Sequence, residues 1–288
     1  MLFLFCRAEL IVSCHPIPNP WLDPMTIFVD LNTDGHVHTS LCHHASGTME
    51  EYVRAAIKKG LHRLVFLEHL EVGVHYFETT WLNSVDFRRY FDEGNRLKER
   101  YAGLIDIGLG VEVGYNPSAE AEILDFLAKY TWDRIGLSYH YFEENGRHIN
   151  MLSRKKVNWD EFSRIGVSKV IGSYFDGLIS AVHNIPAQVL CHLDAVLRFH
   201  PDLYFDDRHK DQIAVLLDAV GHKAMALEIN TSGYVHRGSP YPQAWIVEKA
   251  VEKGIHLSLG SDAHRPEDVG RYFDRIPDFM KALRQISE

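Results

Sequence analysis

Seven short apolar runs, separated by amphipathic stretches, limit what this chain can fold into. The runs are TIFVDL, RLVFLEH, LIDIGLGVEV, WDRIGLSYHY, AQVLCHLDAV, AMALEINTSG and HLSLGSDAH. Between and after them lie stretches with helical periodicity, over residues 48–59, 87–101, 119–130, 167–183, 210–220, 242–253 and 276–286. Such alternation is typical of βα units that build a parallel sheet. The pattern therefore predicts an α/β protein.

The polar ends of these runs favour a closed barrel over an open sheet. Seven units within about 260 residues suit a β/α barrel, which takes roughly 250 residues. Most runs carry His, Asp or Glu near their C-terminal ends, where barrel active sites converge, whereas a doubly wound sheet gathers such groups at one switch point. No GxGxxG or P-loop follows any run, which argues against a nucleotide-binding open sheet. Two longer connections, 73–85 and 143–166, are expected to cover the barrel mouth as lids.

Composition and charge restrict the partners and the location. The 288 residues carry a net charge of −9, which argues against binding to nucleic acid or to an anionic membrane. The four cysteines show no disulfide or metal spacing, which indicates a reducing compartment. The apolar N-terminus is interrupted by Arg7 and Glu9, so it fits neither a signal peptide nor a membrane span. We predict a cytoplasmic protein with an extension over 1–24 and a barrel over 25–288. Met25 is a candidate for the true first residue of the protein.

The stretch DGHVHTSLCHHA places four histidines within twelve residues. His36 and His38 are two apart, so on a strand both point to one face, which at the end of a barrel strand is the interior. Asp34 shares that face and is a candidate to orient one imidazole. Further candidate ligands at or after the ends of runs are His44, His69, Glu112, His140, His192, Asp262 and His264. Because imidazoles and carboxylates bind Zn, Mn or Fe, and too many converge for one ion, we predict two or three divalent ions, with Glu112 bridging two.

The ordered motifs DGHVHTSLCHHA, LEH, GVEV, SYHYF, CHLD and GSDAH resemble those of the polymerase-and-histidinol-phosphatase (PHP) superfamily. The resemblance covers residues 34–264 and implies a distorted seven-stranded (β/α)7 TIM-like barrel with a trinuclear metal site. Carried over by position, it implies these ligands: His36, His38, Glu112 and Asp262 for the first ion, Glu112, His140 and His192 for the second, and His44, His69 and His264 for the third.

Several details are similar to the L-histidinol phosphate phosphatase branch of that superfamily. They are the C-x-H-A ending of the first motif, E-H in place of T-D-H, and ALEINTSG followed by a Y-P helix start. His43 and the segments VGYNPSAEAE and YFEENGRHINMLSRKK depart from the branch. The resemblance implies a phosphomonoesterase of histidine biosynthesis that acts on a small phosphorylated substrate, with a metal-bridging hydroxide attacking phosphorus.

Three more residues are candidates for work on the substrate. Arg198 and Arg237 follow the fifth and sixth runs, so each is expected on the catalytic face, where a guanidinium can bind phosphate oxygens through two nitrogens. Surface ion pairing is the alternative for both. Asp194 is a candidate proton donor to the leaving alkoxide, with a supporting role beside the metal ligands as the alternative. Cys191 neighbours His192 on a strand and is expected to face the opposite side, packed in the core.

Other functions remain open at this point. A phosphodiesterase or a broad small-molecule phosphatase of the same superfamily would need an open mouth. An amidohydrolase also begins with H-x-H, but it commonly bridges its metals with a lysine after the fourth strand, where this chain has His140. A noncatalytic metal-binding module is disfavoured because every motif keeps its ligands. The sequence leaves a homo-oligomer open.

Overall fold

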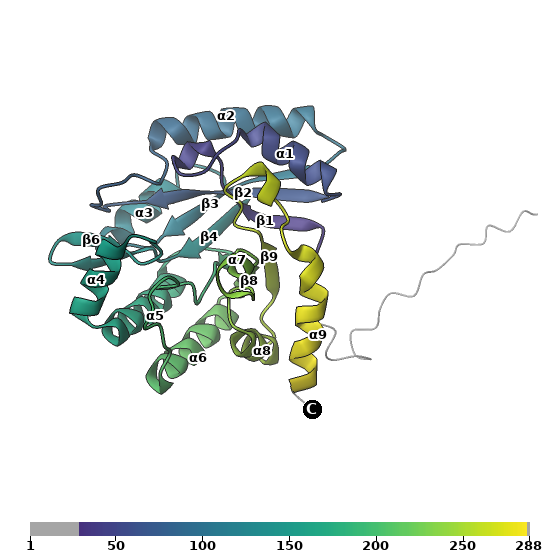
Figure 1. Cartoon of the computed structure of the whole chain (residues 1–288). Coiled ribbons are helices and arrows are strands. Elements are labelled where there is room, and N and C mark those ends of the chain that lie inside the picture. The colour runs from purple at the N-terminus through teal and green to yellow at the C-terminus, as the bar shows by residue number, and fades with distance from the viewer. Residues whose placement is uncertain (1–28, 287–288) are drawn as a thin grey trace, which may run out of the picture.

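The structure, a computed structural model, describes residues 29–286, and seven parallel strands form a nearly closed barrel (Figure 1). The strands are β1 Thr33–Val37, β2 Arg63–Glu71, β3 Asp106–Gly114, β4 Arg134–Ser138, β7 Val189–Leu190, β8 Ala226–Asn230 and β9 Leu257–Gly260. They pair in the order β1-β2-β3-β4-β7-β8-β9, and each ladder is parallel. The predicted α/β class and seven-stranded barrel are confirmed.

Helices surround this barrel, with α1 and α2 over strands β1–β3 and α5, α6 and α8 on the opposite side (Figure 1). The seven predicted helices are α1 Met49–Lys58, α2 Ser84–Arg100, α3 Glu120–Leu127, α5 Val167–Asn184, α6 Asp207–His222, α8 Ala244–Glu252 and α9 Ile276–Ile286. Elements that the pattern does not predict are the hairpin of β5 Tyr141–Glu144 and β6 Arg147–Asn150, helices α4 Lys156–Ile165 and α7 Gly233–Arg237, and 3₁₀ turns at Ser40–Cys42, Pro117–Ala119, Pro266–Asp268 and Phe273–Arg275.

Side-chain caps place the starts of the main helices. Thr48 caps α1, since its side chain accepts from the backbone N–H of Glu51 while the Glu51 carboxylate accepts from that of Thr48. The same reciprocal arrangement opens α2 and α6. Gly94 lets α2 pack closely on the barrel, because a Cβ there would lie 2.3 Å from the Leu109 side chain. Within 29–286 no single helix is long and apolar enough to span a membrane; α4 and α5 pass that test only as a pair, bent by 94°.

The first strand differs from the prediction. The run TIFVDL was expected to be the strand, but β1 begins at Thr33 and contains the motif TDGHV itself. The Asp30 carboxylate accepts hydrogen bonds from the backbone N–H of Asn32 (2.9 Å) and from Thr33 Oγ (2.6 Å), and such a turn ends the apolar run before the strand. Residues 26–28 of that run and the predicted extension over 1–24 lie outside the described residues, so the domain division at residue 24 stays a prediction.

Asp34 closes the barrel between its first and last strands. β1 and β9 are joined by a single bridge between Val37, the last residue of β1, and Ala263, which follows β9. The fully buried Asp34 carboxylate accepts from the N–H (2.9 Å) and Oγ (2.5 Å) of Ser261 and from the N–H of Gly270 (2.7 Å). Asp34 therefore fixes the segment after β9. The prediction that Asp34 orients an imidazole is wrong, because its carboxylate binds the donors of Ser261 and Gly270.

Inside the barrel, beneath its polar end, lies a small apolar cluster of Val65, Leu67, Val189 and Cys191. Val65 and Leu67 share their strand face with His69, so the cluster faces the interior. The prediction that Cys191 is packed is confirmed, but the prediction that it faces away from His192 is wrong. β7 ends at Leu190 and His192 has a φ of +23°, so strand alternation does not extend to this pair.

Replacement of Asp34 by alanine is expected to lower the free energy of unfolding by about 3 kcal/mol, because buried donors of Ser261 and Gly270 lose their acceptor. Urea unfolding of the purified variant measures the change. Asp92→Ala removes a carboxylate from the exposed side of α2 and serves as the control. Equal stability of the two variants would contradict the closing role of Asp34.

Candidate metal centre

The buried carboxylate of Glu112 lies at the centre of a group of imidazoles at the C-terminal end of the barrel. Its Oε2 lies 2.8 Å from His69 Nδ1, and 3.5 and 3.6 Å from the Nε2 atoms of His36 and His38. Its Oε1 lies 2.8 Å from His192 Nε2 and 3.3 Å from His140 Nε2. Strand β3 thus supplies one carboxylate whose two oxygens face two separate sets of histidines.

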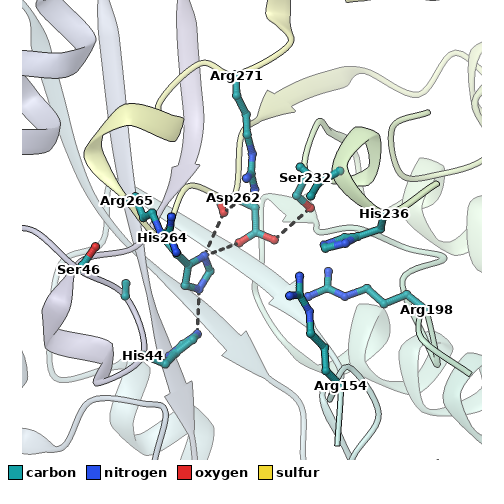
Figure 2. A pocket seen from close by; sticks show the side chains of 12 residues that line it. His44, Ser46, Arg154, Arg198, Ser232, His236, Asp262, His264, Arg265 and Arg271 are labelled. Carbon is teal, nitrogen blue, oxygen red and sulfur yellow. Dashed lines mark hydrogen bonds and ion pairs between the residues drawn. The ribbon is translucent and has the colours of Figure 1, made fainter. Parts of the chain in front are cut away.

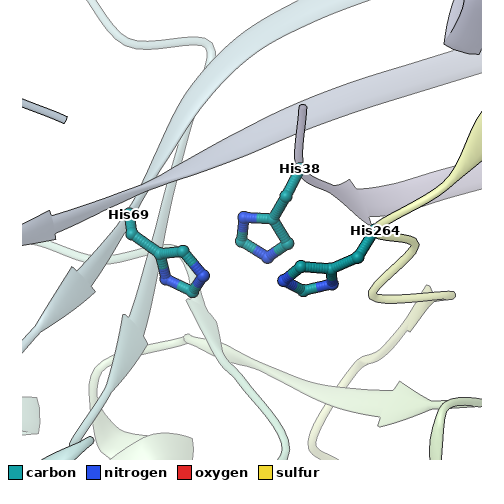
Figure 3. A group of neighbouring side chains, drawn as sticks. All are labelled: His38, His69 and His264. Atoms are coloured by element: carbon teal, nitrogen blue, oxygen red, sulfur yellow. The ribbon is translucent and has the colours of Figure 1, made fainter. Parts of the chain in front are cut away.

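The other predicted ligands complete this group from the first and last strands. Asp262 Oδ1 lies 3.3 Å from His38 Nε2 and 3.5 Å from His264 Nδ1. His264 Nε2 lies 2.8 Å from the Nε2 of His44, which the loop after β1 brings back over the mouth. The rings of His38, His69 and His264 face one another in Figure 3, with centroids of His38 and His69 4.1 Å apart. All nine predicted ligands therefore lie together.

The grouping of their ligand atoms differs from the expected sets. His36, His38 and Asp262 offer atoms within 4.8 Å of one another, as expected for one ion. His38 also groups with His69 and His264, the pair expected to share an ion with His44. His38 thus stands between two expected sites. His69 groups with Glu71 and His140, and the thiols of Cys191 and Cys42 lie within the same distance of predicted ligands.

Three of the predicted ligands, Glu112, His38 and His44, are in charge states that favour cation binding. Burial raises the pKa of Glu112, but His140, His36 and His69 outweigh it and hold the pKa well below its ordinary value. Burial, together with His69 and His264, lowers the pKa of His38 well below its ordinary value and that of His44 to about 3. A carboxylate anion and neutral imidazoles with free lone pairs are the forms that bind metal ions. For His36, burial lowers the pKa, but the carboxylates of Glu228 and Glu112 outweigh burial and raise the pKa well above its ordinary value.

An unpartnered buried atom fits a group of cations. Glu112 Oε2 accepts no hydrogen bond although it lies at the middle of the group. Buried polar atoms are normally hydrogen-bonded, so this oxygen points to a ligand that the polypeptide does not supply. Nitrogen and carboxylate donors in this number suit zinc or another transition metal better than calcium.

Two carboxylates that the sequence analysis missed orient ligand rings. Glu228 Oε1 lies 2.6 Å from His36 Nδ1, and Glu71 Oε1 lies 2.6 Å from His140 Nδ1. Burial lowers the pKa of His140, but Glu112 and Glu71 outweigh it and raise the pKa to about 10. Glu71 stands two residues after His69 on β2, a spacing that signals a shared face. A carboxylate behind a ligand histidine fixes the orientation of its ring.

Glu68 supports the ligand loop from the other side of β2. It is fully buried, and its Oε1 accepts from the N–H (2.9 Å) and Oγ (2.5 Å) of Thr39, which follows His38. Its Oε2 has no partner, and burial raises its pKa to about 8. A buried carboxyl group is costly. Here the Glu68 carboxyl group holds the loop that leads from His38 to His44. Glu68 also precedes His69 directly in the sequence.

A cavity of about 480 Å³ opens beside the ligands His44, Asp262 and His264 (Figure 2). Arg154, from the connection before α4, and Arg198 reach into it next to His236. Nε and Nη1 of Arg198 have no hydrogen-bond partner. Burial, with Arg198 and Arg154 nearby, lowers the pKa of His236 to about 4. The cavity thus presents guanidinium groups to an anion, and Arg154 was missed because its place in a long connection carries no periodic signal.

The structure does not bring Asp194 and Arg237 into that cavity as free groups. Arg237 Nη1 donates to Asp194 Oδ2 over 2.8 Å, and its guanidinium lies 4.1 Å from the ring centre of Tyr241. Asp194 is buried and also accepts from the N–H of Gln243. The two side chains neutralise each other, so this geometry supports a structural ion pair rather than a proton donor and a phosphate ligand.

Comparisons with known proteins agree with this arrangement. A model of the PHP domain matches residues 34–232. A "Probable histidinol-phosphatase" of Deinococcus radiodurans is 30% identical, over 88% of this chain and 93% of the relative. The histidinol-phosphatase of Bacillus subtilis is 28% identical, over 84% and 96%.

Two solved structures share the fold. One, from Listeria monocytogenes, has a TM-score of 0.76 at 25% identity and covers 84% of this chain and 99% of that chain. The other is the histidinol phosphate phosphatase of Lactococcus lactis complexed with Zn, L-histidinol and phosphate. Its TM-score is 0.72 at 22% identity, with 87% of this chain and 93% of that chain covered.

Replacement of Glu68 by leucine is expected to weaken zinc binding by about 10-fold or more, because side chains that position ligands have effects of that size. The unfolding free energy of the metal-free variant should also fall, by about 1–3 kcal/mol, because the buried N–H and Oγ–H of Thr39 lose their acceptor. Zinc competition titration and urea unfolding measure the two quantities. Glu68→Gln keeps an oxygen acceptor for Thr39 and is the control. Unchanged zinc affinity in Glu68→Leu would show that the contact between Glu68 and Thr39 does not position the metal ligands.

Proposed function

The chain belongs to the PHP domain family, and from this premise we propose that it is a metal-dependent phosphomonoesterase that hydrolyses L-histidinol phosphate to L-histidinol and phosphate. The observation that carries the proposal is the Glu112 carboxylate, which five imidazoles surround beside a cavity lined with arginines. The names of the relatives support the substrate. The same proposal places the enzyme in the cytoplasm.

The nine residues of the centre would hold two or three divalent ions. The proposed ligands are His36, His38, His44, His69, Glu112, His140, His192, Asp262 and His264. The ions would supply Lewis acidity, which activates water as a nucleophile and neutralises charge on phosphate oxygens. Zinc is the first choice, since the fold is shared with a zinc-containing structure, and Mn or Fe suits the same donors.

The cavity side chains would bind and orient the phosphate. Arg198 has unpartnered N–H groups, and Arg154 lies beside it, so the two can bind separate phosphate oxygens. Burial, helped by Arg198 and Arg154, lowers the pKa of His236 to about 4, so its ring is neutral at pH 7. His236 can therefore form a hydrogen bond with the phosphate but adds no positive charge. By holding the phosphate ester beside the metal ligands, these side chains would reduce the entropy that is lost when the reacting groups come together.

The charge of the cavity favours a second candidate function, a broad small-molecule phosphatase. Besides Arg154 and Arg198, it is lined by Arg265 and Arg271, and its one carboxylate is Asp262 of the metal centre. An ammonium group such as that of histidinol finds no free carboxylate there, whereas an ester with an anionic leaving group would be attracted. The substrate preference therefore needs a direct test.

We expect purified protein loaded with zinc or manganese to release phosphate from L-histidinol phosphate with a kcat/KM at least about 100-fold above that for p-nitrophenyl phosphate, since binding of the whole substrate lowers the barrier. Phosphate release, with bis(p-nitrophenyl) phosphate as a third substrate, makes the comparison. Equal rates for both monoesters would favour the broad phosphatase, and preferred cleavage of the diester would favour a phosphodiesterase. Absence of turnover for every ester would contradict the hydrolase.

The two arginines predicted from sequence should behave differently when replaced by alanine. Arg198→Ala is expected to raise KM for the phosphate ester roughly 10- to 100-fold, because charged hydrogen bonds to the anion are lost. Arg237→Ala should instead lower the unfolding free energy by about 3 kcal/mol, because buried Asp194 loses its partner. Steady-state kinetics and urea unfolding of both variants distinguish the roles. If Arg237→Ala raised KM more than Arg198→Ala does, Arg237 would be the residue that binds the phosphate.

A further inference from the structure

A second cavity, of about 550 Å³, lies between the connection after β2, the β5–β6 hairpin and helix α4. It is separate from the arginine-lined cavity and shares no lining residue with it. Its hairpin wall belongs to the segment YFEENGRHINMLSRKK, which departs from the histidinol phosphate phosphatase pattern. The metal centre and the phosphate site account for none of its residues.

His148 joins the hairpin to the connection after β2. The residue is 8% exposed and lines the cavity. Its Nδ1 accepts from the backbone N–H of His75 over 3.1 Å, and its own backbone N–H donates to the carbonyl of His75 over 3.3 Å. Nε2 has no hydrogen-bond partner, but it is shielded from solvent, so it is closed to a ligand in the cavity.

The hairpin adds two opposite charges that do not neutralise each other. Glu144 and Arg147 are partners in the β5–β6 ladder, on either side of the turn, and both line the cavity. Within residues 29–286 neither side chain forms a hydrogen bond or an ion pair, whereas Arg164 across the cavity is paired with Glu161. A cation and an anion held side by side are complementary to a ligand that carries both charges.

Apolar side chains form the remaining wall. Phe77 is 66% exposed and Val157 is 58% exposed, and both line the cavity. The Tyr76 ring lines it as well, with its centre 5.2 Å from that of Tyr141. A planar side chain of a ligand would bury apolar surface against this wall.

We propose that this cavity binds a free α-amino acid with an aromatic side chain. Arg147 binds its carboxylate, Glu144 binds its ammonium group, and the wall of Phe77 and Val157 receives its ring. The occupant bridges the two connections that the sequence predicts as lids. Thr80 of the first connection and Tyr141 of β5, joined by a 3.2 Å hydrogen bond, line the small cavity over the metal centre.

Ligand-observed NMR titration of the metal-loaded protein with L-phenylalanine tests the proposal. Histidine is left out because its imidazole would bind the metals. We expect saturable binding with a Kd on the order of 1 mM, as suits a ligand of this size. 3-Phenylpropionate lacks the ammonium group, phenethylamine lacks the carboxylate and L-alanine lacks the ring. Each should therefore bind at least about tenfold more weakly than L-phenylalanine.

Two charge variants locate the binding. Arg147→Ala should reduce affinity for L-phenylalanine about tenfold while leaving phenethylamine binding unchanged, and Glu144→Ala should act in the converse way on 3-phenylpropionate. Lys156→Ala removes a charge from the neighbouring helix outside the cavity and should change neither affinity. Absence of saturable binding, or binding of L-phenylalanine that survives Arg147→Ala, would overturn the proposal. Phosphatase activity plays no part in this test, so its outcome is independent of the proposed reaction.

Discussion

The contact of the Glu112 carboxylate with imidazoles from four other strands or strand ends is the constraint on which the active end of the barrel depends. Its two oxygens face different histidines, His69 at 2.8 Å on one side and His192 at 2.8 Å on the other. A buried anion needs cationic or hydrogen-bonding partners, and the partners here come from four parts of the chain. The barrel therefore has to close with each strand in register for the group to form.

The supporting contacts explain how that register is kept. Asp34 ties the segment after β9 to β1, Glu68 holds the loop between His38 and His44, and Glu228 fixes the ring of His36. Each is a buried carboxylate that accepts from a named donor or faces a named ring, so each has a positional role. This layer of carboxylates lets a site rich in histidine keep its rings in place at the end of a parallel sheet.

Much of this could be predicted from sequence because it follows from strand periodicity. The seven runs and their polar ends indicate the barrel, and two-residue spacing places His36 and His38 on one face. The periodic argument fails where the backbone leaves the strand, as at His192, whose positive φ lets its ring face the same side as Cys191. It is also silent on partners distant in sequence, so the pairing of Asp194 with Arg237 and the arrival of Arg154 at the mouth needed the three-dimensional structure.

We propose that Glu112 holds divalent cations between the two sets of histidines. The metal content and zinc affinity of the protein and of Glu112→Gln, measured by mass spectrometry of the metals and by competition titration, test this role. Glutamine keeps the volume of the side chain but removes its charge. We expect the unaltered protein to bind more than one ion per chain, and Glu112→Gln to remain folded but to lose most of the bound metal. Equal metal content and affinity in the two proteins would contradict it.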